Sequence, residues 1–143
     1  TWKGDELRTG KTQLVTPGHV SVRDCPDLFP ILCALAALCP GQTTLGDAPG
    51  LRTKECDRIK VMAAGLAQIG IVTHERADGL SILGGQPVHG AVATEGDHRV
   101  RMAFRVLSGL VEGGIDVDGV GAEAVSYPDF ERDLYRLVSH ASI

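Results

Sequence analysis

The sequence has little of several things that define common classes of protein. Aromatic residues make up 4% of its 143 residues, so small aliphatic side chains must do most of the packing, which suits thin α/β layers better than an aromatic-rich β-sandwich. No apolar run approaches the roughly 20 residues that a membrane-spanning helix needs. The formal net charge of -4 provides no general positive field for nucleic acid or an anionic membrane. The length suits one domain of modest size, in which function depends on local clusters.

The cysteines also lack the spacing of a metal or redox motif. They lie at positions 25, 33, 39 and 56, with no C-x-x-C pair and no His pair that completes a zinc pattern. We therefore expect no metal ligands, and buried, reduced thiols in a cytoplasmic protein. The chain also begins without Met, which we interpret as a sign of a fragment or a processed product.

Two expected helix starts carry an unusual concentration of charge. One is the segment Lys54–Arg58 (KECDR), and the other is Asp97–Arg99 (DHR). A structural helix start needs one capping oxygen, and cations there oppose the helix macrodipole. Clusters that break this rule indicate a ligand, and the backbone N–H groups of a helix start favour an anion.

The hydrophobic pattern predicts two copies of one unit. In each copy a strand, a helix, a second strand and a second helix follow one another, and the first copy continues into a hairpin around Ala77–Gly79. Aligning Asp27 with His98 gives an offset of 71–72 residues between the copies. We expect units at approximately 13–84 and 85–140 of a partial domain spanning 1–143.

Four segments then carry a resemblance to a known family: PDLFPILCALAAL, LRTKECDRI, GDHRVRMA and SYPDF. They resemble motifs of the enolpyruvyl transferases, over about residues 10–138. The KE-x-DR and DHR signatures resemble the branch that acts on shikimate 3-phosphate rather than the branch that acts on a UDP-sugar. This resemblance implies an α/β (α+β) fold of repeated βαβαββ units in an inside-out arrangement. About two units, from the C-terminal part of the protein, are expected here.

The resemblance also implies an activity. The family reaction moves the carboxyvinyl group of phosphoenolpyruvate onto the 5-hydroxyl of shikimate 3-phosphate, giving enolpyruvylshikimate phosphate and phosphate, on the route to chorismate and the aromatic amino acids. It uses no cofactor. The implied partners are the two substrates and the remainder of the same polypeptide, because other substrate elements of the family lie outside this sequence. The chain alone is therefore expected to be inactive.

Asp27 and Glu55 are the catalytic residues that the resemblance implies. Without the resemblance, Asp27 would be interpreted as a helix N-cap, and Lys54 and Glu55 as a solvated surface pair. In the family pattern, Asp27 contacts the shikimate hydroxyls as a candidate base, and Glu55 is the proton-transfer carboxylate near the vinyl carbon. Which of the two moves which proton stays open.

The substrate-binding residues implied are Asp27, Lys54, Arg58, His98 and Arg99. The resemblance places Lys54 near the hydroxyl or phosphoenolpyruvate, Arg58 and Arg99 on phosphoenolpyruvate, and His98 in an orienting role. The alternatives are an ion pair of Arg58 with a neighbouring carboxylate and a capping or structural role for His98.

The neighbours of these residues have simpler expected roles. We expect Asp97 to be a cap and a supporting residue. Arg101 and Arg105, further along the same helix, are expected to be ordinary surface charges.

One departure from the family pattern stands at Val125, where a Lys is usual. The loss of that cation favours an alternative, a non-catalytic or divergent domain of the same fold that binds anions or assembles with partners. A second alternative, a nucleotide-sugar transferase, is disfavoured by KE-x-DR and DHR. If a third unit of the domain is absent, apolar helix surface remains open, so the fragment is expected to self-associate.

Overall fold

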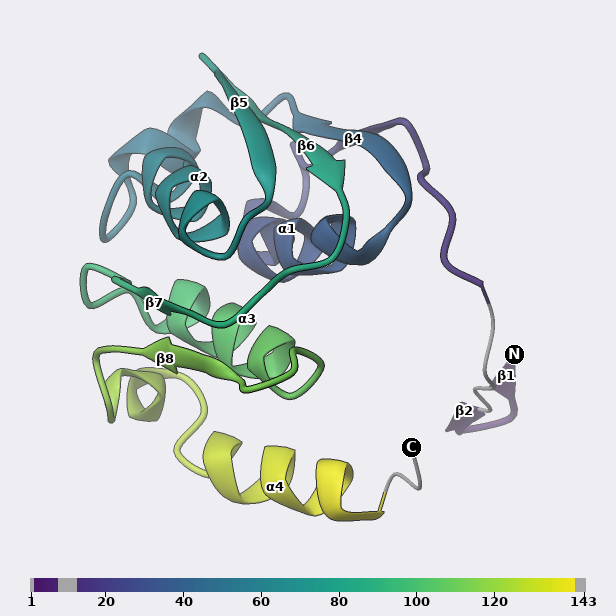
Figure 1. The fold of residues 1–143 in the computed structure, drawn as a ribbon, viewed down its shortest axis with the longest axis vertical. Helices are drawn as coiled ribbons and strands as arrows, with labels where there is room; N and C mark the ends of the chain where they lie inside the picture. The colour runs from purple at the N-terminus through teal and green to yellow at the C-terminus, as the bar shows by residue number, and fades with distance from the viewer. Residues whose placement is uncertain (1, 8–12, 141–143) are drawn as a thin grey trace.

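The computed structural model describes residues 2–7 and 13–140. Residues 1, 8–12 and 141–143 of the expected domain lie outside the described part. Over the described residues, strands and helices alternate in the predicted order (Figure 1). The strands are β1 (Trp2–Lys3), β2 (Glu6–Leu7), β3 (His19–Ser21), β4 (Gly41–Gly46), β5 (Val72–Arg76), β6 (Gly79–Gly84), β7 (Gly90–Val92) and β8 (Ile115–Val117). The helices are α1 (Phe29–Leu38), α2 (Arg58–Gln68), α3 (His98–Ser108) and α4 (Phe130–His140), with 3-10 helices η1 (Pro26–Leu28), η2 (Pro49–Thr53) and η3 (Ala122–Val125).

The larger sheet has four strands in the order β3-β4-β6-β5. β3 pairs with β4 in parallel, and the other neighbours are antiparallel. Helix α1 contacts β4 and β6, while α2 contacts β5 and β6, so both helices pack on the sheet. Figure 1 shows the two helices beneath it. The predicted β5–β6 hairpin is confirmed, and β1 and β2 form a separate antiparallel pair.

The second half of the chain repeats the parallel β-α-β arrangement. β7 pairs with β8 in parallel, and α3 connects them and contacts β8. In both parallel pairs the partner residue lies 25 positions further along, because His19 pairs with Thr44 and Gly90 with Ile115. The two pairs are themselves 71 residues apart in the sequence, which matches the offset predicted from the motifs.

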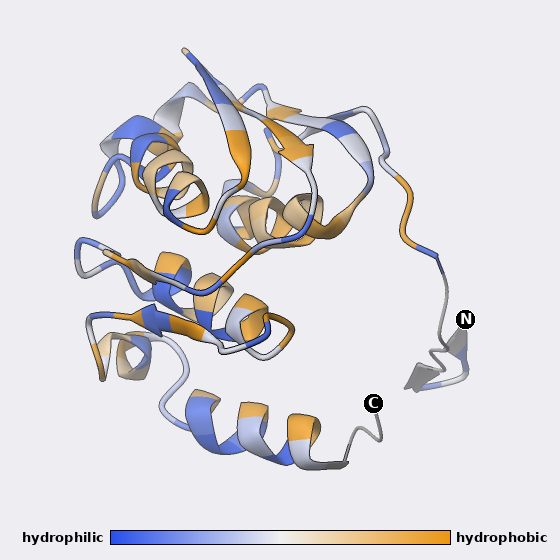
Figure 2. Ribbon diagram, in the orientation of Figure 1, coloured by the Kyte–Doolittle hydropathy of each residue, from blue (hydrophilic) through white to orange (hydrophobic). Residues whose placement is uncertain are grey.

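Helix α1 is the centre of the hydrophobic core. It lies between the four-stranded sheet and α3, with which it makes extensive contact. Its buried residues are mostly small, and Figure 2 shows its surface to be apolar nearly all round, as the sequence predicted. Phe104 on α3 and Leu66 on α2 extend the same core. Among the described residues, none of the helices combines the length and the apolar character needed to cross a membrane.

Some connecting segments are more ordered than simple loops. Cys39 follows α1 in an extended conformation. The connections at Pro49–Thr53 and Ala122–Val125 form the 3-10 helices η2 and η3. Both are stabilised by short-range backbone hydrogen bonds of the kind that single turns share with 3-10 helices, such as Leu51 N to Ala48 O and Ala124 N to Gly121 O.

Candidate active site

Arg58 lies at the start of α2 and binds three carboxylates. Its Nε donates to Asp97 Oδ2 at 2.8 Å, its Nη1 to Asp27 Oδ1 at 2.8 Å and its Nη2 to Glu55 Oε2 at 2.7 Å. The side chain is 0% exposed. A buried cation is costly unless it is paired and hydrogen-bonded, and here each guanidinium nitrogen has a charged acceptor.

The carboxylate of Asp27 in turn receives three cations. Besides Arg58, Arg99 Nη2 lies 3.1 Å from Oδ2, and Lys54 Nζ lies 3.9 Å from Oδ1. The Asp27 side chain is 47% exposed, so it remains open to solvent and to a ligand. Four of the predicted site residues from three separate segments therefore meet at one carboxylate, and Glu55 joins them through Arg58.

The N-termini of α2 and α3 are capped by aspartates and not by the clustered cations. Asp57 Oδ1 accepts from Lys60 N at 3.0 Å and caps α2. Asp97 Oδ1 accepts from Arg99 N and Val100 N at 2.9 and 3.1 Å and caps α3, as expected. Helix capping therefore requires none of the clustered cations, which all pair with Asp27 instead.

The capping alternative for Asp27 is not seen. In the described structure, Leu28 occupies the N-cap of α1 without a side-chain hydrogen bond, and Asp27 lies inside η1. Arg58 does pair with Glu55, one of the alternatives open from the sequence, but not with Asp57, whose Oδ2 accepts from Arg52.

Hydrogen bonds and neighbouring cations favour the ionised forms of Asp27 and Asp97. The bond from Arg58, followed by the charges of Arg99 and Lys54, outweighs desolvation and lowers the pKa of Asp27. Burial opposes ionisation of Asp97, but the bonds from Arg58 and from backbone N–H groups prevail, so its pKa is also lowered. The formal charges of the cations and of the carboxylates cancel. An anion that reaches Arg58 must therefore displace Asp27 or Glu55.

His98 and Cys56 complete the surroundings. His98 is buried at the first position of α3, and within the described residues no hydrogen bond or ion pair joins its ring to the cluster. Cys56 donates its thiol to Asp97 Oδ2 at 3.7 Å, and burial together with the Asp97 charge raises the pKa of Cys56 to about 12. This contact had no signal in the sequence. Nowhere in the described part do three His, Cys, Asp or Glu residues gather in a way that could hold a metal ion.

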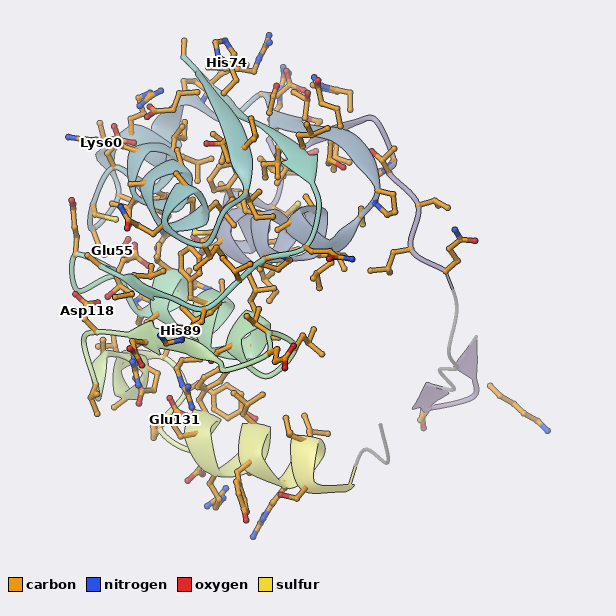
Figure 3. All side chains as sticks on the ribbon, in the orientation of Figure 1. Glu55, Lys60, His74, His89, Asp118 and Glu131 are labelled. Atoms are coloured by element: carbon orange, nitrogen blue, oxygen red, sulfur yellow. The ribbon has the colours of Figure 1, made fainter. Side chains whose placement is uncertain are left out.

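A pocket of about 360 Å³ lies beside the cluster, with Lys54 and Arg23 in its wall. Pro26, next to Asp27, also lines it. Figure 3 shows Glu55 and Asp118 on the same side of the molecule, opposite strands β1 and β2. The site therefore faces solvent along one edge of this chain.

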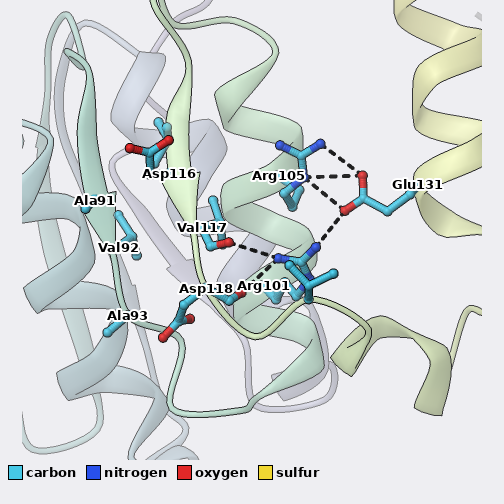
Figure 4. A pocket seen from close by; sticks show the side chains of 11 residues that line it. Ala91, Val92, Ala93, Arg101, Arg105, Asp116, Val117, Asp118 and Glu131 are labelled. Carbon is cyan, nitrogen blue, oxygen red and sulfur yellow. Dashed lines mark hydrogen bonds and ion pairs between the residues drawn. The ribbon is translucent and has the colours of Figure 1, made fainter.

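A second ion-pair network, centred on Arg101, joins α3 to η3 and α4. Arg101 is nearly fully buried and donates to Glu123 Oε2 at 2.6 Å, to Glu131 Oε1 at 2.9 Å and to the carbonyl of Asp118 at 2.8 Å. Arg105 makes a two-pronged contact with Glu131 (Figure 4). The expectation that both are ordinary surface charges is therefore wrong for Arg101 and too simple for Arg105.

Helical spacing could have identified Arg101, because it lies three residues before the buried Phe104 on the inward face of α3. The network also borders an open pocket of about 800 Å³ against β7 and β8. Neither Asp27 nor Arg58 lines that pocket.

Comparison with known proteins decides the family. The model of the family described as EPSP synthase (3-phosphoshikimate 1-carboxyvinyltransferase) matches residues 1–134. The chain belongs to the EPSP synthase family. Family relatives named 3-phosphoshikimate 1-carboxyvinyltransferase include those of Prochlorococcus marinus, 45% identical over 112 residues, and Methanopyrus kandleri, 39% identical over 116 residues. These matches cover 78% and 81% of this chain but 25% and 27% of the relatives.

The solved structure of the EPSP synthase from Acinetobacter baumannii has the same fold. It superposes with a TM-score of 0.75 at 35% identity, over 86% of this chain and 30% of that one. The mixed α/β fold of an enolpyruvyl transferase is thereby confirmed. The chain spans about a quarter of the length of the curated EPSP synthases that it matches.

Proposed function

We propose that this chain is the C-terminal part of a 3-phosphoshikimate 1-carboxyvinyltransferase and contributes repeat units 13–84 and 85–140 to one of its domains. The observation that carries the proposal is the convergence of Lys54, Arg58 and Arg99 on Asp27, with Glu55 on the same guanidinium. Two anionic substrates need cations, and the reaction needs positioned carboxylates. The identical 25-residue pairing intervals support the division into two units.

The cations are assigned to phosphoenolpyruvate. Arg58 binds its carboxylate through the two Nη groups, where guanidinium geometry permits a two-pronged contact. Arg99 approaches from the start of α3 and binds the same substrate, Lys54 lies at the boundary with the sugar hydroxyl, and His98 orients the anion. Substrate binding then exchanges Asp27 and Glu55 for the substrate carboxylate and releases both for proton transfer.

The chemistry divides between these carboxylates. The 5-hydroxyl of shikimate 3-phosphate loses its proton as its oxygen attacks C2 of phosphoenolpyruvate, and the methylene carbon gains a proton. The tetrahedral adduct then expels phosphate and loses a methyl proton, which restores the double bond. Asp27 is placed at the hydroxyl and Glu55 at the methylene carbon, and rates of formation and breakdown of the adduct in variants of each determine which proton each one moves. No cofactor or metal is required in this scheme.

The chain alone is proposed to be inactive. Asp27 is half-exposed and the neighbouring pocket is open, which supports a site that is closed by another part of the polypeptide. The remainder of that polypeptide is therefore the proposed partner, in the cytoplasm, with no role for nucleic acid or membrane.

Self-association of the separated chain is also proposed. Apolar residues of α1, of α3 and of the turn after α3 line a groove of about 190 Å³: Ile31, Leu32, Ala34, Leu35, Leu38, Val106, Leu107 and Leu110. Several of them are exposed, and a continuous apolar surface of this kind favours association.

A second candidate function follows from Val125. Its side chain is 80% exposed, at the place where the family resemblance implies a substrate-binding lysine. Losing a charge-assisted hydrogen bond costs about 1.5–3 kcal/mol. This observation favours a divergent anion-binding or assembly domain, which retains the cluster around Asp27 but does not catalyse the reaction.

Two experiments test the proposal. Calorimetric titration of the 143-residue chain with phosphoenolpyruvate and shikimate 3-phosphate should be silent, and saturable binding with turnover would contradict an incomplete site. In the full-length polypeptide, Glu55→Gln should slow formation or breakdown of the tetrahedral adduct at least a hundredfold (order of magnitude for acid–base catalysis). The matched exposed acid, Glu112→Gln, should do neither. Wild-type rates for both steps in Glu55→Gln would refute the role assigned to Glu55.

A further inference from the structure

Asp97 contacts both helix starts of the site through different oxygens. Oδ1 accepts from the backbone N–H groups of Arg99 and Val100, and Oδ2 accepts from Arg58 Nε and the Cys56 thiol. The carboxylate is 0% exposed. One buried side chain therefore fixes the first turn of α3 and, at the same time, the guanidinium at the start of α2.

The other carboxylates on Arg58 are different in kind. Asp27 and Glu55 are 47% and 51% exposed and bind the two Nη groups, which form the two-pronged face of the guanidinium. Asp97 binds Nε, at the side of that face. When an anion replaces Asp27 and Glu55, Asp97 is the counter-charge that stays.

The turn that precedes Asp97 in the sequence is also held in place. Glu95 and Gly96 both have positive φ, 50° and 75°, so the turn uses two consecutive left-handed residues. Asp97 N donates to Thr94 O. Thr94 in turn donates its N–H and its hydroxyl to Asp118 Oδ1 at 2.8 and 2.7 Å. A strained turn of this kind persists only where its surroundings determine it.

We propose that Asp97 is a positioning residue for anion binding. It holds Arg58 by Nε, so that both Nη groups face the ligand, and it holds the start of α3, so that Arg99 reaches the same point. Asp97 itself touches no substrate. The proposal rests on the function proposed above and adds a residue to it.

The molecule contains a matched control for the structural part of this role. Asp57 caps α2 with Oδ1, and its Oδ2 accepts from Arg52 Nη1 at 2.9 Å. Arg52 bonds to the backbone carbonyls of Ala77 and Arg76 and does not contact Asp27 in the described structure. Asp57→Asn therefore perturbs a helix cap and an arginine pair without touching the anion site.

The decisive experiment compares Asp97→Asn, Asp57→Asn and Arg58→Gln in the full-length polypeptide. Asn keeps a capping oxygen at each position. At position 97, however, a neutral amide replaces the charged carboxylate that accepts from Arg58 Nε, so the guanidinium is no longer anchored. We expect Asp97→Asn to raise the KM for phosphoenolpyruvate at least tenfold while kcat falls less than threefold. Asp57→Asn should change that KM less than twofold, and it should lower Tm less than Asp97→Asn does, because the Arg52–Asp57 pair is more exposed.

Equal KM values for Asp97→Asn and Asp57→Asn would overturn the positioning role. If Arg58→Gln also left KM unchanged, the proposed function itself would fail, so the two failures are distinguishable. A measurement on wild type covers the case in which Asp97→Asn does not fold. With phosphoenolpyruvate as the probe, the ¹⁵N resonance of Arg58 Nε should move less than those of Nη1 and Nη2. An Nε resonance that moves most would mean that Asp97 is displaced, contrary to the proposal.

Discussion

Asp57 and Asp97 make the same pair of contacts at the starts of α2 and α3, a helix cap and an arginine pair. Each caps its helix with Oδ1, and each accepts an arginine nitrogen on Oδ2, at 2.9 Å from Arg52 and 2.8 Å from Arg58. The difference lies in burial, because the Arg52 side chain is 30% exposed and the Arg58 side chain is fully buried. One local motif therefore serves structure at the first position and the candidate active site at the second.

This difference in burial predicts unequal losses of stability. Arg58→Gln leaves Asp97 as an unpaired buried carboxylate, and breaking a buried pair from one side costs about 3–5 kcal/mol. Arg52→Gln breaks a solvent-screened pair and should cost less than about 1 kcal/mol from that pair. Urea unfolding of the two variants checks the prediction, and a loss for Arg58→Gln as small as that for Arg52→Gln would contradict it.

Asp97 should also make stability depend on acid pH. Hydrogen bonds from Arg58 and the backbone hold its folded pKa below that of a free aspartate, so its contribution is fully present above the unfolded pKa of about 3.9. That contribution is lost as pH falls through the lower, folded pKa. Asp97→Asn should therefore be less stable than wild type at pH 7, and the gap should shrink below about pH 4.

Urea midpoints between pH 7 and pH 2 measure this effect. Asp129→Asn is the control, because Asp129 is exposed at the start of α4, next to Arg132. The difference in urea midpoint between Asp129→Asn and wild type should stay small from pH 7 to pH 2. A gap for Asp97→Asn that remained constant down to pH 2 would mean that the carboxylate is not preferentially ionised in the folded chain.

Much of the fold could be predicted because this chain is locally consistent. Apolar spacing located α1, α2 and α3, and the parallel pairs β3–β4 and β7–β8 follow from the repeated order. The clusters at Lys54–Arg58 and Asp97–Arg99 were visible as cations where capping needs none. The meeting of Asp27 with Arg99 depends on how the two units pack, and the resemblance implied it whereas the local pattern did not.

The errors also have a physical cause. A charged side chain on a helix is usually solvated, so Arg101 was expected at the surface. It is buried because Glu123 and Glu131, more than 20 residues away in sequence, return to neutralise it. Long-range pairing of this kind leaves no periodic signal, although the position of Arg101 on the inward face of α3 was a hint.

The Arg101 network predicts a local role for Glu123. Glu123→Gln keeps the shape but removes the charge beside a buried guanidinium, and we expect a loss of about 2–4 kcal/mol. Backbone amides of η3 and the first turn of α4 should then exchange hydrogen faster than those of α1. The control is Asp129→Asn in the exposed pair with Arg132, where the expected loss is below about 1 kcal/mol. Unchanged protection of η3 in Glu123→Gln would show that Arg101 does not hold this segment.

Val125 predicts a gain of function. Val125→Lys should lower the KM for phosphoenolpyruvate by about tenfold in the full-length polypeptide, in line with one added charge-assisted contact. Stability should change by less than about 0.5 kcal/mol, because the side chain is exposed. Val120→Lys is the control for added charge, since Val120 is also exposed in the loop before η3. An equal gain from both variants would indicate general attraction of an anion rather than a restored contact.

The apolar groove predicts how the separated chain behaves in solution. Leu110 lines the groove beside α3 and is exposed, and Val72 on β5 is equally exposed but does not line the groove. A lysine at either position adds the same charge at little cost in folding stability. If copies of the chain associate through the groove, Leu110→Lys should shift sedimentation toward the monomer, because it places a charge against apolar surface. Val72→Lys should leave the distribution as in wild type, and the reverse result would place the contact on the sheet instead.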